Sequence, residues 1–161
     1  MATILRFLQS IALVTWVGGI FFLGAIAAPA AFATLSSRGD AGAVVGHMLG
    51  KLHLMGYAAG AIFLIATMAL AKSPAALLKP AALLVIAMLL LTVVNQHGIN
   101  PRLADLRVQM SSEFGSVDQT PQGNPLRAQF GKLHGVSTLI ELGVLLLGVA
   151  AIFFTVKSLP T

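Results

Sequence analysis

Four histidines and one glutamate are the residues of this sequence best suited to chemistry. The histidines are His47, His53, His97 and His134, and Glu141 lies inside a long apolar stretch. Imidazole binds metal ions and haem iron, and it exchanges protons near neutral pH. The chain has no cysteine. This excludes disulfides, thiolate ligands and a covalently attached c-type haem.

The elements that must position these side chains are four long apolar runs. Of 161 residues, 57% are hydrophobic and 9% charged, whereas soluble domains carry about 25% charged residues. Crossing a bilayer takes roughly 20 apolar residues, and in lipid the backbone must satisfy its own polar groups. The runs that qualify are Ile4–Phe32, Gly42–Ala71, Pro80–Gln96 and Phe130–Val156. The sequence therefore predicts an all-α integral membrane four-helix bundle.

We expect a single transmembrane domain over residues 1–161. Its predicted helices cover about 4–32, 42–71, 80–110 and 126–157; the membrane part of the third ends at about 96, and a loop covers 111–125. Asp40 is the predicted N-cap of the second helix. The N-terminal apolar run is longer than the usual ~7–15 residues of a signal peptide, so we interpret it as the first helix.

A short internal repeat indicates how the helices are paired. Gly50-Lys51-Leu52-His53 recurs as Gly131-Lys132-Leu133-His134, near the start of the second and fourth helices. Pro29 and Pro101 similarly mark the predicted exits of the first and third helices. The repeat predicts two helical hairpins in parallel orientation, a 2+2 pseudo-repeat about an axis along the membrane normal. The alternative is a chance match in a low-complexity apolar chain.

Connectivity places three imidazoles in one layer near one membrane face. At 1.5 Å per residue, His53 lies about 27 Å from the end of its helix, at the hydrocarbon edge. His97 and His134 fall at similar depth. Glu141 shares a helix face with His134 and lies about two turns deeper, where an ionisable group usually faces a bundle interior. Glu141 with His134 is therefore a candidate proton relay.

Three hypotheses compete for this layer. In the first, His53 and His134 are the axial ligands of haem b, with His97 as a supporting or alternative ligand. Residues that would pair with the propionates or line the pocket are Arg127, Lys51, Lys132, Tyr57 and Trp16. This would give the protein a redox or electron-transfer role.

In the second hypothesis, His53, His97 and His134 hold copper or zinc, because imidazole and the nearby thioethers of Met48 and Met55 suit copper. The protein would then handle or transport metal. In the third, the polar side chains only fix helix register through interhelical hydrogen bonds, as in a structural membrane subunit without cofactor.

Other features narrow the function classes and partners. The net charge is +5, but the basic residues are scattered, which excludes a nucleic-acid surface. Nucleophile-elbow, Walker and zinc-protease motifs are absent, and enzymatic activity stays open. Arg102, Asp105 and Arg107 are predicted to form a solvated face. Expected partners are the lipid bilayer, a redox protein and a second copy of the chain. We expect the cell inner or plasma membrane, with cytoplasmic termini.

Several short motifs resemble a known family. They are Trp16-Val17-Gly18-Gly19, Ala27-Ala28-Pro29-x-x-Phe32, Gly50-Lys51-Leu52-His53, Asn100-Pro101 and Lys132-Leu133-His134. Together they resemble the transmembrane protein 205-like family of four-helix membrane proteins of unknown function, over nearly the whole chain. More distantly, they are similar to the copper resistance D group and the membrane protoporphyrinogen oxidases. The resemblance implies that His53, His97 and His134 matter for haem or copper.

Overall fold

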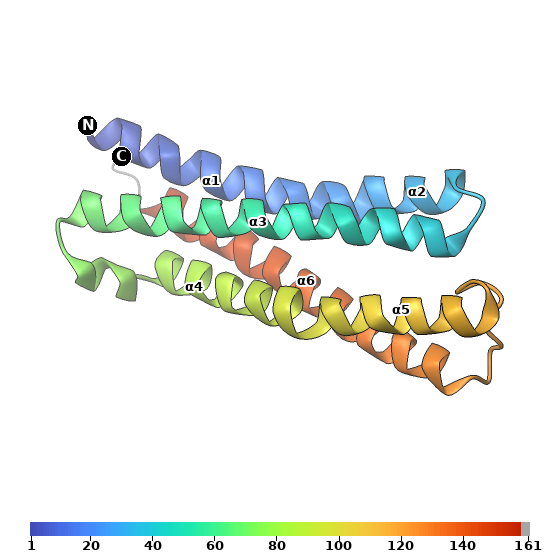
Figure 1. Cartoon of the computed structure of the whole chain (residues 1–161). Helices are drawn as coiled ribbons and strands as arrows, with labels where there is room; N and C mark the ends of the chain where they lie inside the picture. Colours follow the sequence, from blue (N-terminus) through green and yellow to red (C-terminus); the bar gives the residue numbers. More distant parts are fainter. Residues whose placement is uncertain (159–161) are drawn as a thin grey trace.

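Four long helical segments make up the protein (Figure 1). The computed structural model describes residues 1–158, and within them it contains helices and turns without strands. Residues 159–161 of the expected domain lie outside the described residues. The segments long and apolar enough to cross a membrane are Ala2–Thr34, Arg38–Ala71, Pro80–Phe114 and Pro125–Lys157. The predicted all-α class with four membrane helices is confirmed.

The first and third segments each consist of two α-helices joined by a π-helical turn. The first comprises α1 (Ala2–Phe22), the π turn Leu23–Ala27 and α2 (Ala28–Thr34). The third comprises α4 (Pro80–Val93), the π turn Val94–Ile99 and α5 (Asn100–Phe114). The second and fourth segments are the single helices α3 (Arg38–Ala71) and α6 (Pro125–Lys157), and a 3₁₀ turn (Pro74–Leu78) precedes α4.

Both π turns have a proline as their physical cause. A proline inside a helix lacks an N–H, and its ring clashes with the carbonyl four residues earlier. For Pro29 and Pro101 those carbonyls belong to Ala25 and His97, which lie within the two π turns. The wider turn relieves the clash, so both segments continue as α2 and α5. Both prolines therefore lie inside continuing helical segments, as the predicted helices over about 4–32 and 80–110 place them.

The start of α3 also differs from the expectation. The helix begins at Arg38, four residues before Gly42, and its N-cap is Ser37, whose hydroxyl accepts a hydrogen bond of 3.1 Å from the Asp40 N–H. Asp40 lies in the first turn, where a carboxylate interacts favourably with the helix dipole. The hydroxyl of Ser37 reaches the backbone at this position, so Asp40 is not the cap.

The segments pack as a ring of two hairpins. α1 packs most closely on α3 and α4 on α6, while α1 with α6 and α3 with α4 close the bundle (Figure 1). The start of α1 and the end of α6 lie at the same end. Pro101 follows Pro29 by 72 positions, and the same offset places Leu23–Ala27 inside the second π turn. The matching turns favour the predicted 2+2 repeat.

The helices are longer than a membrane is thick. A helix of 34 residues, such as α3, measures about 50 Å, against about 30 Å of hydrocarbon. α5 is polar, whereas the opposite end carries Lys72, Lys79 and Lys157 where the spans end. We therefore place the hydrocarbon toward the terminal end. The overhang, defined as α5 with residues 38–46 of α3 and 125–131 of α6, lies beyond it.

Candidate functional site

A buried histidine holds the centre of the polar interior. His53, on α3, is 1% exposed. Its Nε2 lies 2.7 Å from Oε1 of Glu141 on α6, and its Nδ1 lies 2.6 Å from Oε1 of Gln96 in the second π turn. Both ring nitrogens of His53 are therefore bonded to side chains from other segments.

Two asparagines extend this arrangement. The side-chain amide of Asn95 donates to Glu141 Oε1 at 2.7 Å, and that of Asn100 donates to Gln96 Oε1 at 3.4 Å. Asn95 and Gln96 are consecutive, and the π-helical turn that holds them lets both reach inward. We call these five residues the His53–Glu141 network. The network joins α3 of the first hairpin to the π turn, α5 and α6 of the second.

The bonding pattern fits an ion pair and its neutral form equally. Gln96 and Glu141 each present an oxygen to the imidazole of His53. An imidazolium donates to both oxygens when Glu141 is a carboxylate, and a neutral imidazole bonds both when Glu141 carries the proton. In either form the His53–Glu141 pair has no net charge. Within residues 1–158 it is the only ion pair. The Glu141 side chain is 15% exposed against 2% for His53, so Glu141 is the accessible end.

Two buried polar atoms beside the network have no hydrogen-bond partner in the described part of the chain. They are Oδ1 of Asn95 and the hydroxyl of Tyr57, which lies one turn after His53 on α3. Leaving such an atom unpaired costs about 1–3 kcal/mol. A water molecule or a polar group of a ligand would satisfy each of them. The layer is therefore chemically suited to take up a further small polar group.

The network lies at the overhang side of an apolar layer. His53 is about 27 Å and Glu141 about 24 Å from the terminal end of their helices. Between the network and that end lie the core side chains of Trp16, Phe63 and Met88. The network therefore has polar surroundings on one side and a mainly apolar core on the other, which also contains the buried Gln9–Thr67 hydrogen bond.

The structure does not bring the three predicted histidines together. His134 is exposed, and its ring stacks on Phe130 with centroids 6.0 Å apart. His97 is also exposed, and its ring stacks on Tyr57 at 6.4 Å. Across residues 1–158, the histidine and acidic side chains form no group of three placed to hold a metal ion. Glu141 has His53 as its partner, not His134.

The remaining predicted residues surround the network without joining it. Lys51 and Lys132 are exposed, and the guanidinium of Arg127 donates to the Thr120 carbonyl. Trp16 is buried against Gly56, where an added Cβ would lie 2.6 Å from the indole.

A bis-histidine haem does not fit this donor arrangement. Each axial ligand needs a free ring nitrogen facing the iron, but both nitrogens of His53 are bonded to Gln96 and Glu141. His134 lies on the outside of the bundle. Haem b, and copper as its alternative, stay predictions made from the sequence.

Gln96 is the network residue that sequence reasoning missed. It marks the end of an apolar run, where a polar residue is expected at the lipid boundary. The available signal was the cluster Asn95-Gln96-His97 ahead of Asn100-Pro101, where a proline four residues after His97 requires a local change of helix type. In the same cluster, Asn95 bonds Glu141 and Asn100 bonds Gln96.

Comparison with known families places this chain. A family model described as "Domain of unknown function (DUF4149)" matches residues 11–112, well over half of the sequence. The chain belongs to this family. The DUF4149 match runs from α1 to near the end of α5 and includes His53 and Gln96, whereas Glu141 lies beyond it. No curated protein and no solved structure matches the chain. The resemblance to transmembrane protein 205-like proteins stays a prediction.

Proposed function

We propose that this integral membrane protein binds protons and carries them across the membrane, with the His53–Glu141 network as its proton site. The observation that carries the proposal is the buried pair of His53 Nε2 and Glu141 Oε1, 2.7 Å apart. Ionisable groups inside a membrane bundle are costly, and they mark ion pathways and proton relays.

The pair can exchange a proton without leaving an unpaired charge. Transfer of the proton from Nε2 of His53 to Oε1 of Glu141 converts imidazolium and carboxylate into neutral imidazole and carboxylic acid. The hydrogen bond remains, and the net charge of the pair is zero before and after. Because an isolated charge in low dielectric is far more costly than a paired one, this route keeps the barrier low. The partly exposed Glu141 is the site of proton entry and release.

The pair also links proton binding to the arrangement of the hairpins. His53 belongs to the first hairpin, and Glu141 and Gln96 belong to the second. Loss of the proton from the pair leaves one of its charges without an opposite charge and weakens the connection between hairpins. The apolar core between the network and the terminal end closes the site on that side. Access from that end therefore requires a rearrangement of the hairpins, as in the alternating access of membrane carriers.

Proton flux into liposomes tests this proposal. Purified protein is reconstituted with a pH-sensitive dye inside, and a potassium diffusion potential drives protons inward. We expect the wild type to acidify the lumen, and Glu141→Gln and His53→Gln to lose most of the flux. Glu113→Gln is the matched control, because Glu113 is an exposed carboxyl outside the network. A wild-type rate no higher than that of empty liposomes, or an unchanged rate in Glu141→Gln, overturns the proposal.

The sequence-based alternative is a haem b protein that passes electrons to a partner protein, with His53 and His134 as ligands. An absorption spectrum of protein produced with ample haem, before and after reduction by dithionite, tests it. A Soret band that shifts on reduction and is lost in both His53→Ala and His134→Ala would replace the proton proposal. A flat spectrum rejects haem, and metal analysis of the same sample then decides on copper.

We also infer that the termini lie in the cytoplasm, at the inner or plasma membrane. The terminal end carries Arg6, Lys72, Lys79 and Lys157 and no acidic residue. A plain count of basic residues favours the overhang end instead, but two of its six, Lys51 and Lys132, belong to the repeat and are candidate site residues.

A further inference from the structure

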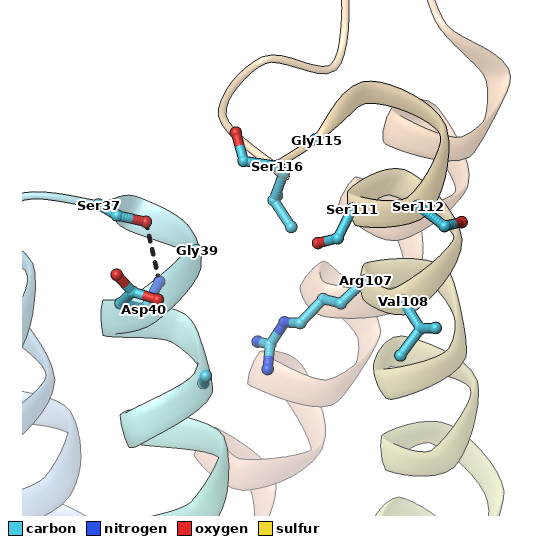
Figure 2. Close-up of a pocket in the computed structure, with 11 residues that line it drawn as sticks. Ser37, Gly39, Asp40, Arg107, Val108, Ser111, Ser112, Gly115 and Ser116 are labelled. Carbon is cyan, nitrogen blue, oxygen red and sulfur yellow. Dashed lines mark hydrogen bonds between the residues drawn. The ribbon is translucent and has the colours of Figure 1, made fainter.

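A cavity of about 590 Å³ lies in the overhang, away from the His53–Glu141 network. Its walls are the start of α3, one face of α5 and the turn after α5 (Figure 2). Most of the lining surface is apolar, although more than half of the lining residues are polar or charged: Ser37, Asp40, Arg107, Ser111, Ser112 and Ser116. These polar groups are available to a ligand from the aqueous or headgroup layer.

Arg107 points from α5 into this cavity. Its guanidinium is directed toward α3 in Figure 2, and the residue is half-buried. An added Cβ at Gly42 or Gly46 would lie 3.2 Å from its Nη atoms, so these two glycines leave room for the guanidinium. The ring of Phe130 lies 5.4 Å from Cζ and supports it by a cation–π contact. Within the predicted solvated face, Arg107 is thus directed toward α3 and the cavity.

The charge of Arg107 has no protein counterpart. In residues 1–158 no carboxylate lies within ion-pair distance of its guanidinium. Ser111 follows one turn later on α5 and points the same way in Figure 2. Its hydroxyl has no partner in this part of the chain either. A fork of guanidinium donors beside a free hydroxyl matches the oxygens of a phosphate.

The opposite wall carries the opposite charge. Asp40 lines the cavity from the first turn of α3 and makes no ion pair within the described residues. The nearby Asp118 differs, because its carboxylate accepts bonds from the Ser37 hydroxyl and the Gly39 N–H. The cavity therefore presents a free cation on one wall and a free carboxylate on the other.

We propose that this cavity binds a phosphate that carries a neighbouring ammonium, as phosphoethanolamine does. The phosphate lies on Arg107 and Ser111, and the ammonium donates to Asp40. Two sources share this chemistry: the headgroup of a membrane lipid and a soluble phosphoamine. Arg107 lies about 40 Å from the start of α4, beyond about 30 Å of hydrocarbon, so headgroups and water both reach this level. The proposal is independent of the proton site.

Binding of soluble probes to the detergent-purified full chain tests the site. Phosphoethanolamine and inorganic phosphate are titrated by calorimetry into the wild type and three variants. Arg107→Gln is expected to lose both ligands. Asp40→Asn is expected to weaken phosphoethanolamine and to retain or strengthen phosphate, because the carboxylate attracts only the ammonium. Arg102→Gln, an exposed arginine on α5 outside the cavity, is expected to bind like the wild type.

Native mass spectrometry distinguishes the two sources. The protein is released from nanodiscs that contain equal amounts of phosphatidylethanolamine and phosphatidylcholine. If the ligand is a lipid, the wild type is expected to retain the ethanolamine lipid and Arg107→Gln is expected to lose it. Binding of soluble phosphoethanolamine without lipid retention assigns a soluble ligand. Failure of the wild type to bind any of these probes overturns the proposal, as does equal binding by wild type and Arg107→Gln. If Arg107 and Asp40 only pair with each other, no probe binds to the wild type. The stability losses of Arg107→Gln and Asp40→Asn are then non-additive in the double variant.

Discussion

Identical residue types in the repeat have different environments. His53 is buried with both nitrogens bonded, whereas His134, its counterpart in the repeated Gly-Lys-Leu-His, is exposed. The difference reflects what lies opposite each helix. His53 faces the π turn with Gln96 and the carboxylate of Glu141, and His134 faces outward beside Phe130. Side-chain chemistry thus depends on helix rotation as well as residue type.

Packing around the single tryptophan gives a prediction at this scale. Gly56→Ala would place a Cβ 2.6 Å from the buried indole of Trp16, and the crowding is expected to cost about 1–3 kcal/mol. Thermal unfolding in detergent should show a lower Tm. Gly18→Ala is the matched control, because nothing lies within 4 Å of its added Cβ, and it is expected to leave Tm unchanged or raise it. Equal effects of the two changes would contradict this packing.

Residue depth could be predicted from the sequence, but residue partners could not. Counting along the helix places Glu141 and His53 in the membrane layer, and both lie in the network. The heptad spacing of Arg127, His134 and Glu141 predicts one shared face. However, a shared helix face does not imply a shared environment, and the drift of about 20° per heptad is too small to separate the two residues. Glu141 lies opposite His53, whereas the exposed His134 lies beside Phe130, and only the packed neighbours determine this difference.

At the scale of elements, hydropathy predicts where helices lie but not where they change type. The third segment was expected to leave the bilayer at about residue 96 and to continue to about 110, and α5 ends at Phe114. The π turn between α4 and α5 escaped prediction, because hydropathy does not report the local widening that accommodates a proline within a continuing helix. Packing on both sides of Pro101 makes continuation more favourable than termination.

The N-cap of α3 gives a prediction at this scale. Ser37→Ala removes the hydroxyl that accepts from the Asp40 N–H and donates to Asp118, and it is expected to cost about 1 kcal/mol. Faster hydrogen exchange at the first amides of α3, together with a lower Tm, should report the loss. Ser36→Ala is the control, since Ser36 is exposed and makes no hydrogen bond within the described residues. Unchanged exchange in Ser37→Ala would show that the cap does not hold the helix start.

At the scale of the whole molecule, the four-helix architecture follows from composition alone. Too few charged residues are present to cover a water-facing surface, and the apolar runs are as long as a bilayer requires. The residues that form the overhang cavity cannot be predicted from composition. Arg107 reaches α3 only because Gly42 and Gly46 leave room, and a pair of glycines spaced by four is typically read as a helix-packing motif.

Orientation in the membrane gives the prediction at this scale. If the lysines of the terminal end lie at the cytoplasmic surface, green fluorescent protein fused after Lys157 is expected to fluoresce. The matching alkaline phosphatase fusion should be inactive there, and active when inserted into the loop after Phe114. The reverse pattern would mean that Lys51 and Lys132, both exposed, count toward the cytoplasmic side.

The π turn at Val94–Ile99 sets the rotation of α5 relative to α4 about their common helix axis. In a regular α-helix one residue corresponds to about 100° of rotation. Removing a single residue there would leave a helix of nearly the same length whose far half had turned by that angle. α4 would still pack on α6, but Arg107 would no longer face α3. The His53–Glu141 network and the overhang cavity therefore depend on the same rotation between α4 and α5. A one-residue deletion would change this rotation without breaking the fold.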